Sequence, residues 1–482
     1  MAQSKASEKG AFETIRITSS QESLRQFQDD FSESHVTRRE LVKRLHYTIN
    51  LPPVSEQRMK KVQSGREAAA NNTAFTQAIV DLFQGLSDWG SGDITLVVRV
   101  ASPSDTDEDL FASLDSSHPG SPIWDVRNDF KYLGFDSSLY TASGIAQVRA
   151  ISGLDLREDF SNVKRRLNPT CIYAISFALP NLTRLTWECL LPSRRLESSR
   201  KEIRLALAQT LQDSALNHLK HLEIYLEDSD PLNESFDPGS FCQSSEEDAL
   251  SLAVGRVLQL PAIVKVNLTG LWTIAPAAFA STTAFSSLLE SVNVEASGTT
   301  PDGKWLSIGT EKDDVDQDEP DSDTDASVAD FDSADSDTSD FVPEHEWERE
   351  AGHFPVSMWR TSLDTEVLVP HILPLVKTTH KIPSLRALKY ELTTHPSPLF
   401  IEYFAPGVEN VSARRLSNGR GAFERDNVHR PRWYLTVVQG FDPSWRVPPD
   451  LISAMSESDG CIFWDGPTKQ ISTEDGKGLK DV

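Results

Sequence analysis

A short pattern of apolar residues recurs along this chain of 482 residues. Each copy has one apolar residue followed by two more that are separated by a single position. Residues two apart in an extended strand point to the same face, so each copy predicts a short strand with one buried face. The seven copies of this apolar triplet are Phe12/Ile15/Ile17, Val42/Leu45/Tyr47, Leu182/Leu185/Trp187, Leu219/Leu222/Ile224, Ile263/Val266/Leu268, Leu289/Val292/Val294 and Leu385/Leu388/Tyr390.

Three of the triplets follow the same junction, in which a helical apolar pattern ends at a Leu-Pro or Ile-Pro pair. The prolines are Pro180, Pro261 and Pro383. Proline cannot continue a helix and disfavours helical geometry in the residue before it, so each junction predicts a helix end followed by an extended segment. Repeated units of helix, proline and strand must bury their apolar faces against neighbouring units.

The clearest helix is predicted from Arg66 to Trp89, because its apolar residues recur at steps of three and four. Glycines at Gly90 and Gly92 then interrupt the helix, and the segment ITLVVRV predicts a strand. The apolar face of the helix comprises Phe75, Ile79, Leu82, Phe83, Leu86 and Trp89. The strand should place Ile94, Leu96, Val98 and Val100 on one face.

The apolar triplet is the strand pattern of leucine-rich repeats, but these repeats are irregular. The intervals between triplets vary, and the Asn or Cys that regular repeats place at the ninth position is absent. Those positions hold Leu190, Glu227, Leu271, Ser297 and Thr393. We therefore predict an α/β fold: an irregular leucine-rich-repeat-like solenoid with a disordered acidic insertion and a small C-terminal closing sheet.

The pattern changes after Tyr390, where LFIEYF, RWYLTVV and CIFWDG predict the strands of the closing sheet. An arginine-rich loop is expected between these strands. Its arginines are Arg414, Arg415, Arg420, Arg425, Arg430 and Arg432. Trp445 and Trp464 have two interpretations, as core residues or as exposed anchors for a partner.

Composition completes the division of the chain. Residues 101–125 are rich in Ser, Asp and Pro, which predicts a surface excursion. Residues 310–345 are too poor in apolar groups to offset the entropy of ordering. The predicted parts are an N-terminal repeat region (1–100), a mobile surface excursion (101–140), a central repeat region (141–309), a disordered acidic insertion (310–345) and a C-terminal repeat with the closing sheet (346–482).

The net charge of −25 is concentrated in one segment. Residues 311–350 contain 18 Asp and Glu against Lys312 and Arg349, so the rest of the chain is only mildly acidic. This balance argues against a general binder of nucleic-acid phosphates. No stretch approaches the roughly 18 apolar residues of a membrane span, and the four cysteines form no CxxC pair. We expect a cytoplasmic or nuclear protein with no nucleic-acid and no membrane partner.

Two serines in the acidic tract are candidate phosphosites. Ser322 is followed by Asp325 and Ser327 by Asp330, the spacing favoured by acid-directed kinases. The other interpretation of the tract is a solvated linker. Phosphate at these serines would deepen the negative field and change docking to a basic surface.

Catalytic and metal-binding motifs are incomplete or absent. The sequence has no phosphate-binding loop, no nucleophile elbow and no dinucleotide-binding glycine motif. The run from His345 begins like a zinc-protease helix but ends in Arg349, and Glu319 stands where a calcium loop needs glycine. For His218 and His221, hydrogen bonding or exposure is favoured over a metal site. We therefore expect no enzyme, with no catalytic, cofactor-binding or metal-binding residues.

Over nearly its whole length the chain resembles fungal F-box proteins with degenerate leucine-rich-repeat-like bodies. The resemblance rests on FETIRITSSQESLRQFQDDF with Arg38 and Arg39, INLPP, NNTAFTQAIVDLFQGLSDW, ALPNLTRLTWE, TPDGKWLSIG and RPRWYLTVVQGFDPSW. It implies the substrate-recognition body of an F-box-type ubiquitin ligase adaptor, or a scaffold derived from one. Such proteins carry an F-box upstream of the segment that matches Phe12, where only eleven residues are present. We expect the F-box to be lacking, with the ligase core a partner only if an F-box is encoded upstream.

The sequence thus predicts a non-enzymatic protein–protein interaction protein and does not identify its protein partner. The alternative is an acidic chaperone-like binder of basic proteins such as histones. That alternative rests on the charge of residues 311–350 alone.

Overall fold

A computed structural model describes most of the chain. The described residues are 12–55, 58, 63–106, 132–139, 144–157, 166–242, 247–280, 285–309, 344–394, 398–415, 419–437, 445–465, 470–472 and 479–481. They form two compact units, with residues up to Ile224 in unit 1 and residues from Tyr225 onward in unit 2.

Unit 1 alternates strands and helices. Its strands are β1 (Thr14–Thr18), β2 (Arg44–Asn50), β3 (Ile94–Ala101), β4 (Ile151–Leu156) and β5 (Arg184–Leu190), and β6 (His221–Glu227) spans the division between the units. Its helices include α2 (Gln21–Asp30), α3 (Val36–Arg39), α5 (Gly65–Leu86), α9 (Pro169–Phe177) and α10 (Glu197–Gln212), with short 3-10 turns η1 (Glu33–His35), η2 (Pro103–Thr106) and η3 (Ser214–Leu216). β1 to β5 pair in sequence order, and every pairing is parallel.

Unit 2 begins with parallel strands and ends in a mixed sheet. Its strands are β7 (Lys265–Trp272), β8 (Ser291–Ser297), β9 (Ser307–Ile308), β10 (Ser362–Leu363), β11 (Ala387–Thr393), β12 (Leu399–Phe404), β13 (Arg432–Val437), β14 (Cys461–Asp465), β15 (Gln470–Ser472) and β16 (Leu479–Asp481). Its helices include α11 (Ala249–Leu258), α12 (Glu344–Ala351), α13 (Thr365–Thr379), α14 (Val411–Arg414), α15 (Gly419–Asn427) and α16 (Pro449–Ser456), with 3-10 turns η4 (Pro276–Ala278) and η6 (Glu457–Asp459).

In unit 2, β7, β8 and β11 are parallel neighbours, and β12 lies antiparallel between β11 and β13. β13 and β14 are parallel, and β15 and β16 add two antiparallel pairings. β9 and β10 form a separate antiparallel pair. The chain is therefore a mixed α/β protein in which most strand pairings are parallel.

The apolar triplets form continuous rows across the strands. In unit 1, Ile15/Leu45/Leu96/Leu154/Leu185 form one row, and Ile17/Tyr47/Val98 and Leu156/Trp187 are also in register. In unit 2 the rows are Val266/Val292/Leu388 and Leu268/Val294/Tyr390. All row residues are buried except the half-buried Ile15. Each of the seven predicted triplets places its last two residues in a strand, which confirms the strand prediction. Burial of apolar surface, at roughly 25 cal/mol per Å², is the main force that joins neighbouring strands into a core.

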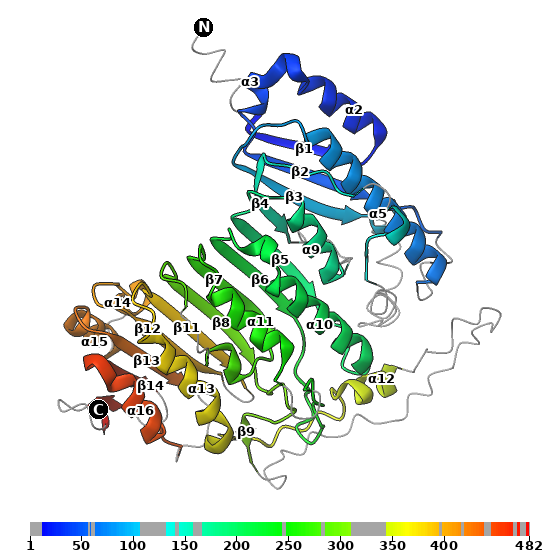
Figure 1. Cartoon of the computed structure of the whole chain (residues 1–482). Coiled ribbons are helices and arrows are strands. Elements are labelled where there is room, and N and C mark those ends of the chain that lie inside the picture. Colours follow the sequence, from blue (N-terminus) through cyan, green and yellow to red (C-terminus); the bar gives the residue numbers. More distant parts are fainter. Residues whose placement is uncertain are drawn as a thin grey trace. The chain divides into compact units, whose positions relative to one another are not determined.

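Helices cover the side of each sheet that carries the rows. Figure 1 shows α5 and α9 over one side of the unit 1 strands, and α11 and α13 over one side of β7, β8 and β11 in unit 2. Tyr47 Oη donates to the carbonyl oxygen of Ala78 in α5 at 2.9 Å, and His371 Nε2 of α13 lies 2.8 Å from Tyr390 Oη. Because Tyr47 and Tyr390 are row residues, these contacts leave the opposite side of each sheet to the alternate, polar positions.

The long predicted helix is confirmed by α5. Ser64 caps it, since Ser64 Oγ accepts from Glu67 N at 3.3 Å and Ser64 N donates to Glu67 Oε2 at 2.8 Å. The helix ends at Leu86, and Trp89 is buried just beyond it. β3 follows as predicted, but Val97 is also buried, so this strand buries residues on both faces. Among the residues with a defined placement, no helix has the length and apolarity needed to cross a membrane.

β4 was missed, although Ile151, Leu154 and Leu156 have the triplet spacing. Residues 107–131 of the predicted mobile excursion lie outside the described part, and within residues 132–139 Gly134 N donates to Asn72 Oδ1 in α5 at 2.9 Å. The last two residues of the insertion predicted at 310–345 belong to α12, which begins at Glu344, and residues 310–343 lie outside the described part.

The three strands predicted after Tyr390 are confirmed as β12, β13 and β14. They do not form a separate closing sheet, because β12 pairs with β11 and so continues the sheet of β7, β8 and β11. The arginine-rich loop between them was wrong, because α14 and α15 occupy much of that segment and Arg432 lies in β13. Trp445 and Trp464 are both buried, with ring centroids 5.6 Å apart, so the core interpretation holds for them.

Candidate functional site

In unit 1 the polar side of the sheet carries a cluster of basic residues. Register places Arg16 of β1 opposite His46 of β2, while Arg44 and Arg99 lie on the same side of β2 and β3. The sequence brings them together because each occupies a strand position that alternates with a row residue. We call Arg16, Arg44, Arg99 and His46 the basic cluster.

Charge in the basic cluster is only partly balanced. Arg44 Nη2 lies 3.2 Å from Asp155 Oδ2, but Asp155 also accepts from Arg157 Nη2 at 3.0 Å. The side chain of Arg44 is still 45% exposed, and that of Arg157 49% exposed. Arg16 is exposed and makes no ion pair with a described residue. The cluster therefore presents guanidinium groups to solvent.

The pKa of His46 is affected by the charges of these arginines. Burial lowers the pKa of His46, and Arg44, Arg16 and Arg99 lower it further, while Asp155 opposes them. Its Nδ1 atom is buried and has no hydrogen-bond partner among the described residues. A carboxylate bound here would contact the guanidiniums and offset the field on the imidazole. The arrangement is suited to binding an anion.

The polar side of the unit 2 sheet is different. It holds a pocket of about 490 Å³ whose lining includes Glu295, Glu391 and Glu402. Glu295 and Glu391 are register partners on β8 and β11. Burial raises the pKa of Glu391, and the charge of Glu295 raises it further. We call this cavity the sheet pocket.

The cations of the sheet pocket are already paired. Lys389 Nζ lies 3.6 Å from Glu402 Oε1, and Arg420 forms an ion pair with the other oxygen of Glu402. The guanidinium of Arg420 also lies over the ring of Tyr434, 4.8 Å from its centroid. Glu295 accepts from Gly270 N at 2.7 Å. The pocket is thus acidic at the Glu295/Glu391 end and internally neutralised at the other.

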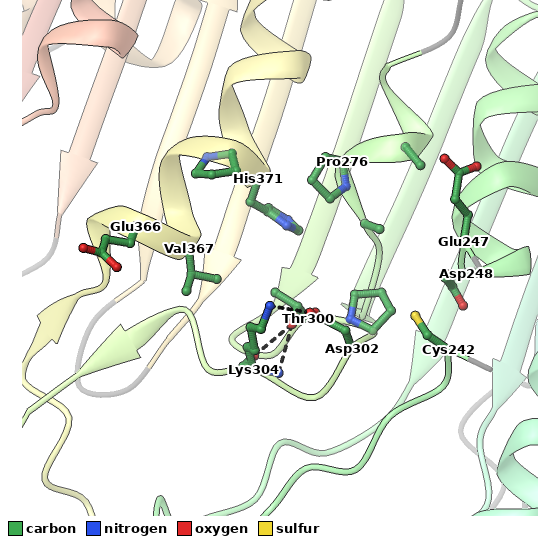
Figure 2. Close-up of a pocket in the computed structure, with 14 residues that line it drawn as sticks. Cys242, Glu247, Asp248, Pro276, Thr300, Asp302, Lys304, Glu366, Val367 and His371 are labelled. Atoms are coloured by element: carbon green, nitrogen blue, oxygen red, sulfur yellow. Dashed lines mark hydrogen bonds and ion pairs between the residues drawn. The ribbon is translucent and has the colours of Figure 1, made fainter. Parts of the chain in front are cut away.

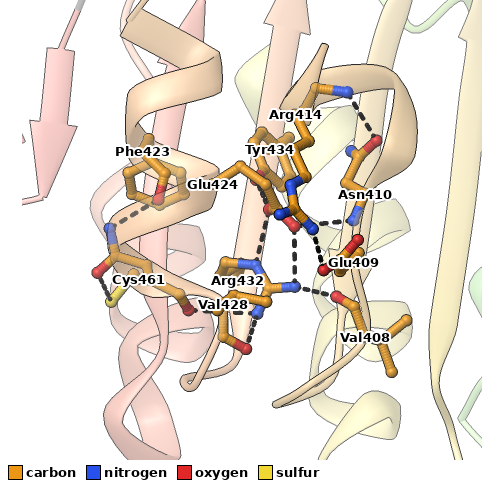
Figure 3. Close-up of polar contacts among 12 residues, drawn as sticks. Val408, Glu409, Asn410, Arg414, Phe423, Glu424, Val428, Arg432, Tyr434 and Cys461 are labelled. Atoms are coloured by element: carbon orange, nitrogen blue, oxygen red, sulfur yellow. Dashed lines mark hydrogen bonds and ion pairs between the residues drawn. The ribbon is translucent and has the colours of Figure 1, made fainter.

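A buried ion pair connects the segment around α14 and α15 to the strands beside the sheet pocket (Figure 3). Arg432 Nε of β13 donates to Glu424 Oε2 of α15 at 2.9 Å, and the two side chains are 0% and 1% exposed. Glu424 also accepts from Tyr434 Oη and from Asn410 N, the latter at 2.8 Å. Arg432 Nη1 donates to the carbonyl oxygens of Val428 and Arg430. Arg432 is therefore a structural residue and is not available to a ligand.

The predicted site residues Ser322 and Ser327 lie outside the described residues. His218 precedes β6, His221 begins it, and both are exposed. No group of metal-ligating side chains is found among the described residues. The basic cluster was missed, although reading the polar face of TIRIT, RLHYTIN and ITLVVRV would have located it.

Comparisons with known proteins give no assignment: no family model matches the chain, and no curated protein matches it. The geometry of the polar faces is therefore the basis for a functional proposal.

Proposed function

We propose that this chain is a non-enzymatic protein-recognition protein, in which an irregular leucine-rich-repeat-like solenoid presents the polar side of its sheet to a protein partner. The in-register rows and the helices on one side support this proposal, because they leave a row of alternate side chains for contact. By its sequence resemblance, the chain is the substrate-recognition body of an F-box-type ubiquitin ligase adaptor or a scaffold derived from one, in the cytoplasm or nucleus.

The basic cluster is the observation that carries the proposal. Exposed guanidiniums bind carboxylates through paired hydrogen bonds, and Arg is enriched where protein interfaces carry their binding energy. The partner of unit 1 is therefore an acidic protein segment.

Binding of a fluorescein-labelled Glu-rich peptide, followed by fluorescence anisotropy, tests this assignment. The double variant Arg16→Ser/Arg44→Ser should weaken binding at least about tenfold, since each charge-assisted hydrogen bond contributes about 1.5–3 kcal/mol. The matched control is Arg25→Ser/Arg66→Ser, which removes two exposed arginines from α2 and α5 and causes the same change in net charge.

Equal weakening by both double variants would show general charge attraction and defeat the assignment. Tight binding of a histone-derived Lys-rich peptide that is lost when Asp313, Asp314, Asp316, Asp318, Asp321, Asp323 and Asp325 become Asn would favour the acidic-chaperone alternative. That alternative stays a prediction, because these residues lie outside the described part of the chain.

The adaptor and scaffold forms of the proposal are separable. The genomic sequence upstream of Met1 shows whether an F-box is encoded, and purification of the tagged native product shows what accompanies it. Ligase core subunits in that preparation support the adaptor. Their absence, together with no upstream F-box, supports the scaffold.

A further inference from the structure

A second pocket, of about 360 Å³, lies in unit 2 beside the start of α13 (Figure 2). Its walls come from the segments that follow β7 and β8, from the first turns of α13 and from the residues before α11. Ligand sites in proteins with parallel strands concentrate at such loop ends, and this volume falls within the range of small-molecule pockets. We call it the His371 pocket.

The His371 pocket has an excess of negative charge. Its lining includes the carboxylates of Glu247, Asp248, Asp302 and Glu366, and its cation is Lys304. Lys304 Nζ is occupied by Asp302 Oδ2 at 2.7 Å. Glu247 and Glu366 are exposed, and neither side chain makes an ion pair with a described residue. The field of the pocket therefore favours a cation over an anion.

The remaining walls are largely apolar. Pro276, Pro301, Val367 and Pro370 line the pocket, together with small alanines of the η4 segment. These side chains form no hydrogen bonds, and covering them with the apolar part of a ligand is favourable. A ligand that fits both sets of walls has an apolar body and a positive charge.

His371 supplies a third requirement. Figure 2 shows its side chain directed from α13 toward the space between Pro276 and Lys304. The residue is only 4% exposed, and its Nε2 atom is engaged with Tyr390 Oη at 2.8 Å. Its Nδ1 atom is buried without a hydrogen-bond partner among the described residues. A buried polar atom without a partner is costly, so a ligand that bonds to it gains affinity.

We infer that the His371 pocket binds a small molecule with a primary amine, an apolar body and a hydroxyl group. The amine is attracted by Glu247 and Glu366, the body packs on the prolines, and the hydroxyl bonds to His371 Nδ1. This site is independent of the basic cluster and of the recognition function proposed above.

Three probes of similar size separate these requirements. Tyramine carries all three features, phenethylamine lacks the hydroxyl, and 4-hydroxyphenylacetate replaces the amine by a carboxylate. Titration of the full chain, followed by protein NMR shifts or calorimetry, should rank tyramine first. The carboxylate should bind about tenfold or more weakly, because like charges repel, and phenethylamine about fivefold more weakly.

Variants locate the binding. Glu366→Gln should weaken tyramine severalfold, whereas Glu350→Gln, an exposed change of the same charge on α12, should not. His371→Phe should abolish the preference for tyramine over phenethylamine. If that variant does not fold, Val367→Trp, at a half-buried position in the wall, should block all three probes. Equal binding of the amine and carboxylate probes, or equal effects of the two Glu variants, would overturn the inference.

Discussion

The polar faces of the two units differ in whether their charged side chains are paired, although the apolar rows of both units follow the same pattern. In unit 1, Arg16 and Arg44 remain exposed, and Asp155 is the carboxylate that pairs with Arg44. In unit 2, Glu402 is neutralised by Lys389 and Arg420. The rows must be apolar for the strands to pack, whereas the alternate positions are free to vary. The difference in charge between the two units therefore lies at positions that the apolar rows do not constrain.

The arginines of the two units illustrate the same difference. Arg44 is 45% exposed beside a carboxylate that it shares with Arg157, so its pairing contributes little to stability. Arg432 is 0% exposed and has Glu424 and several carbonyl oxygens as partners. A buried charge that loses its partner is strongly destabilising. In unit 1 the cation of this pair stays exposed, whereas unit 2 buries this one within its structure.

Removal of the buried carboxylate should have the largest effect. We expect Glu424→Ala to lower the free energy of unfolding by about 3 kcal/mol or more, because Arg432 would be left buried without a counter-charge. Urea denaturation measures this change. Glu409→Ala, which removes the partner of the exposed Arg414, is the control and should cost less than about 1 kcal/mol. Similar costs for the two variants would contradict the structural role of Glu424.

Acid should weaken unit 2 through His371. Burial lowers the pKa of His371 from an ordinary 6.5 to about 4, so the unfolded chain takes up the proton first. The stability linked to the neutral ring is present above pH 6.5 and is lost as the pH falls toward 4, by at most about 3 kcal/mol. His371→Gln should reduce the loss of stability over this interval. An unchanged pH dependence in that variant would show that the folded and unfolded chains protonate this ring equally, so that its pKa is not lowered by burial.

Glu391 should have a smaller effect on stability, and its effect should depend on pH in the opposite direction to that of His371. Burial and Glu295 raise its pKa, so the stability that it contributes is present below its ordinary pKa and is lost as the pH rises through the folded value. Glu391→Gln should therefore stabilise the protein at neutral pH, by about 0.5 kcal/mol for a partly exposed group. The gain should disappear in acid. Glu402→Gln should instead destabilise, because it weakens the pairs with Lys389 and Arg420.

The smallest expected effect is a difference in how the pKa values of His46 and His371 respond to salt. Burial is the largest cause of the lowered pKa of both rings, but arginine charges lower further only the pKa of His46. Raising salt from about 0.01 M to about 1 M shortens the Debye length from about 30 Å to about 3 Å. The pKa of His46 should rise toward its ordinary value, and that of His371 should change less. NMR titration of both rings measures this, and equal shifts would contradict the difference between the faces.

Strand positions were largely predictable because the rows are a local pattern. The last two residues of each triplet, such as Leu45/Tyr47 and Val292/Val294, are the buried residues of one strand face. β4 was missed because Gly153 interrupts the same segment, although Leu154 and Leu156 continue the rows. The glycine fits a crowded position, since a Cβ there would lie 2.9 Å from Thr95 Oγ1.

The sites were less predictable because they join residues that are distant in sequence. Net charge along the chain concealed the basic cluster, whose members Arg16, Arg44 and Arg99 are separated by helices. The pairing of Arg432 with Glu424 could not be identified from their spacing in the sequence. The His371 pocket similarly joins segments near Asp302 and Glu366, which a long acidic segment separates in sequence.

The titration of His46 in the presence of an acidic peptide tests the central claim most directly. A Glu-rich peptide bound at the basic cluster adds negative charge beside the ring, so the NMR-detected pKa of His46 should rise. The rise should persist in Arg25→Ser/Arg66→Ser and be lost in Arg16→Ser/Arg44→Ser. If the peptide binds with the same affinity and the pKa of His46 does not change, the basic cluster is not the recognition surface.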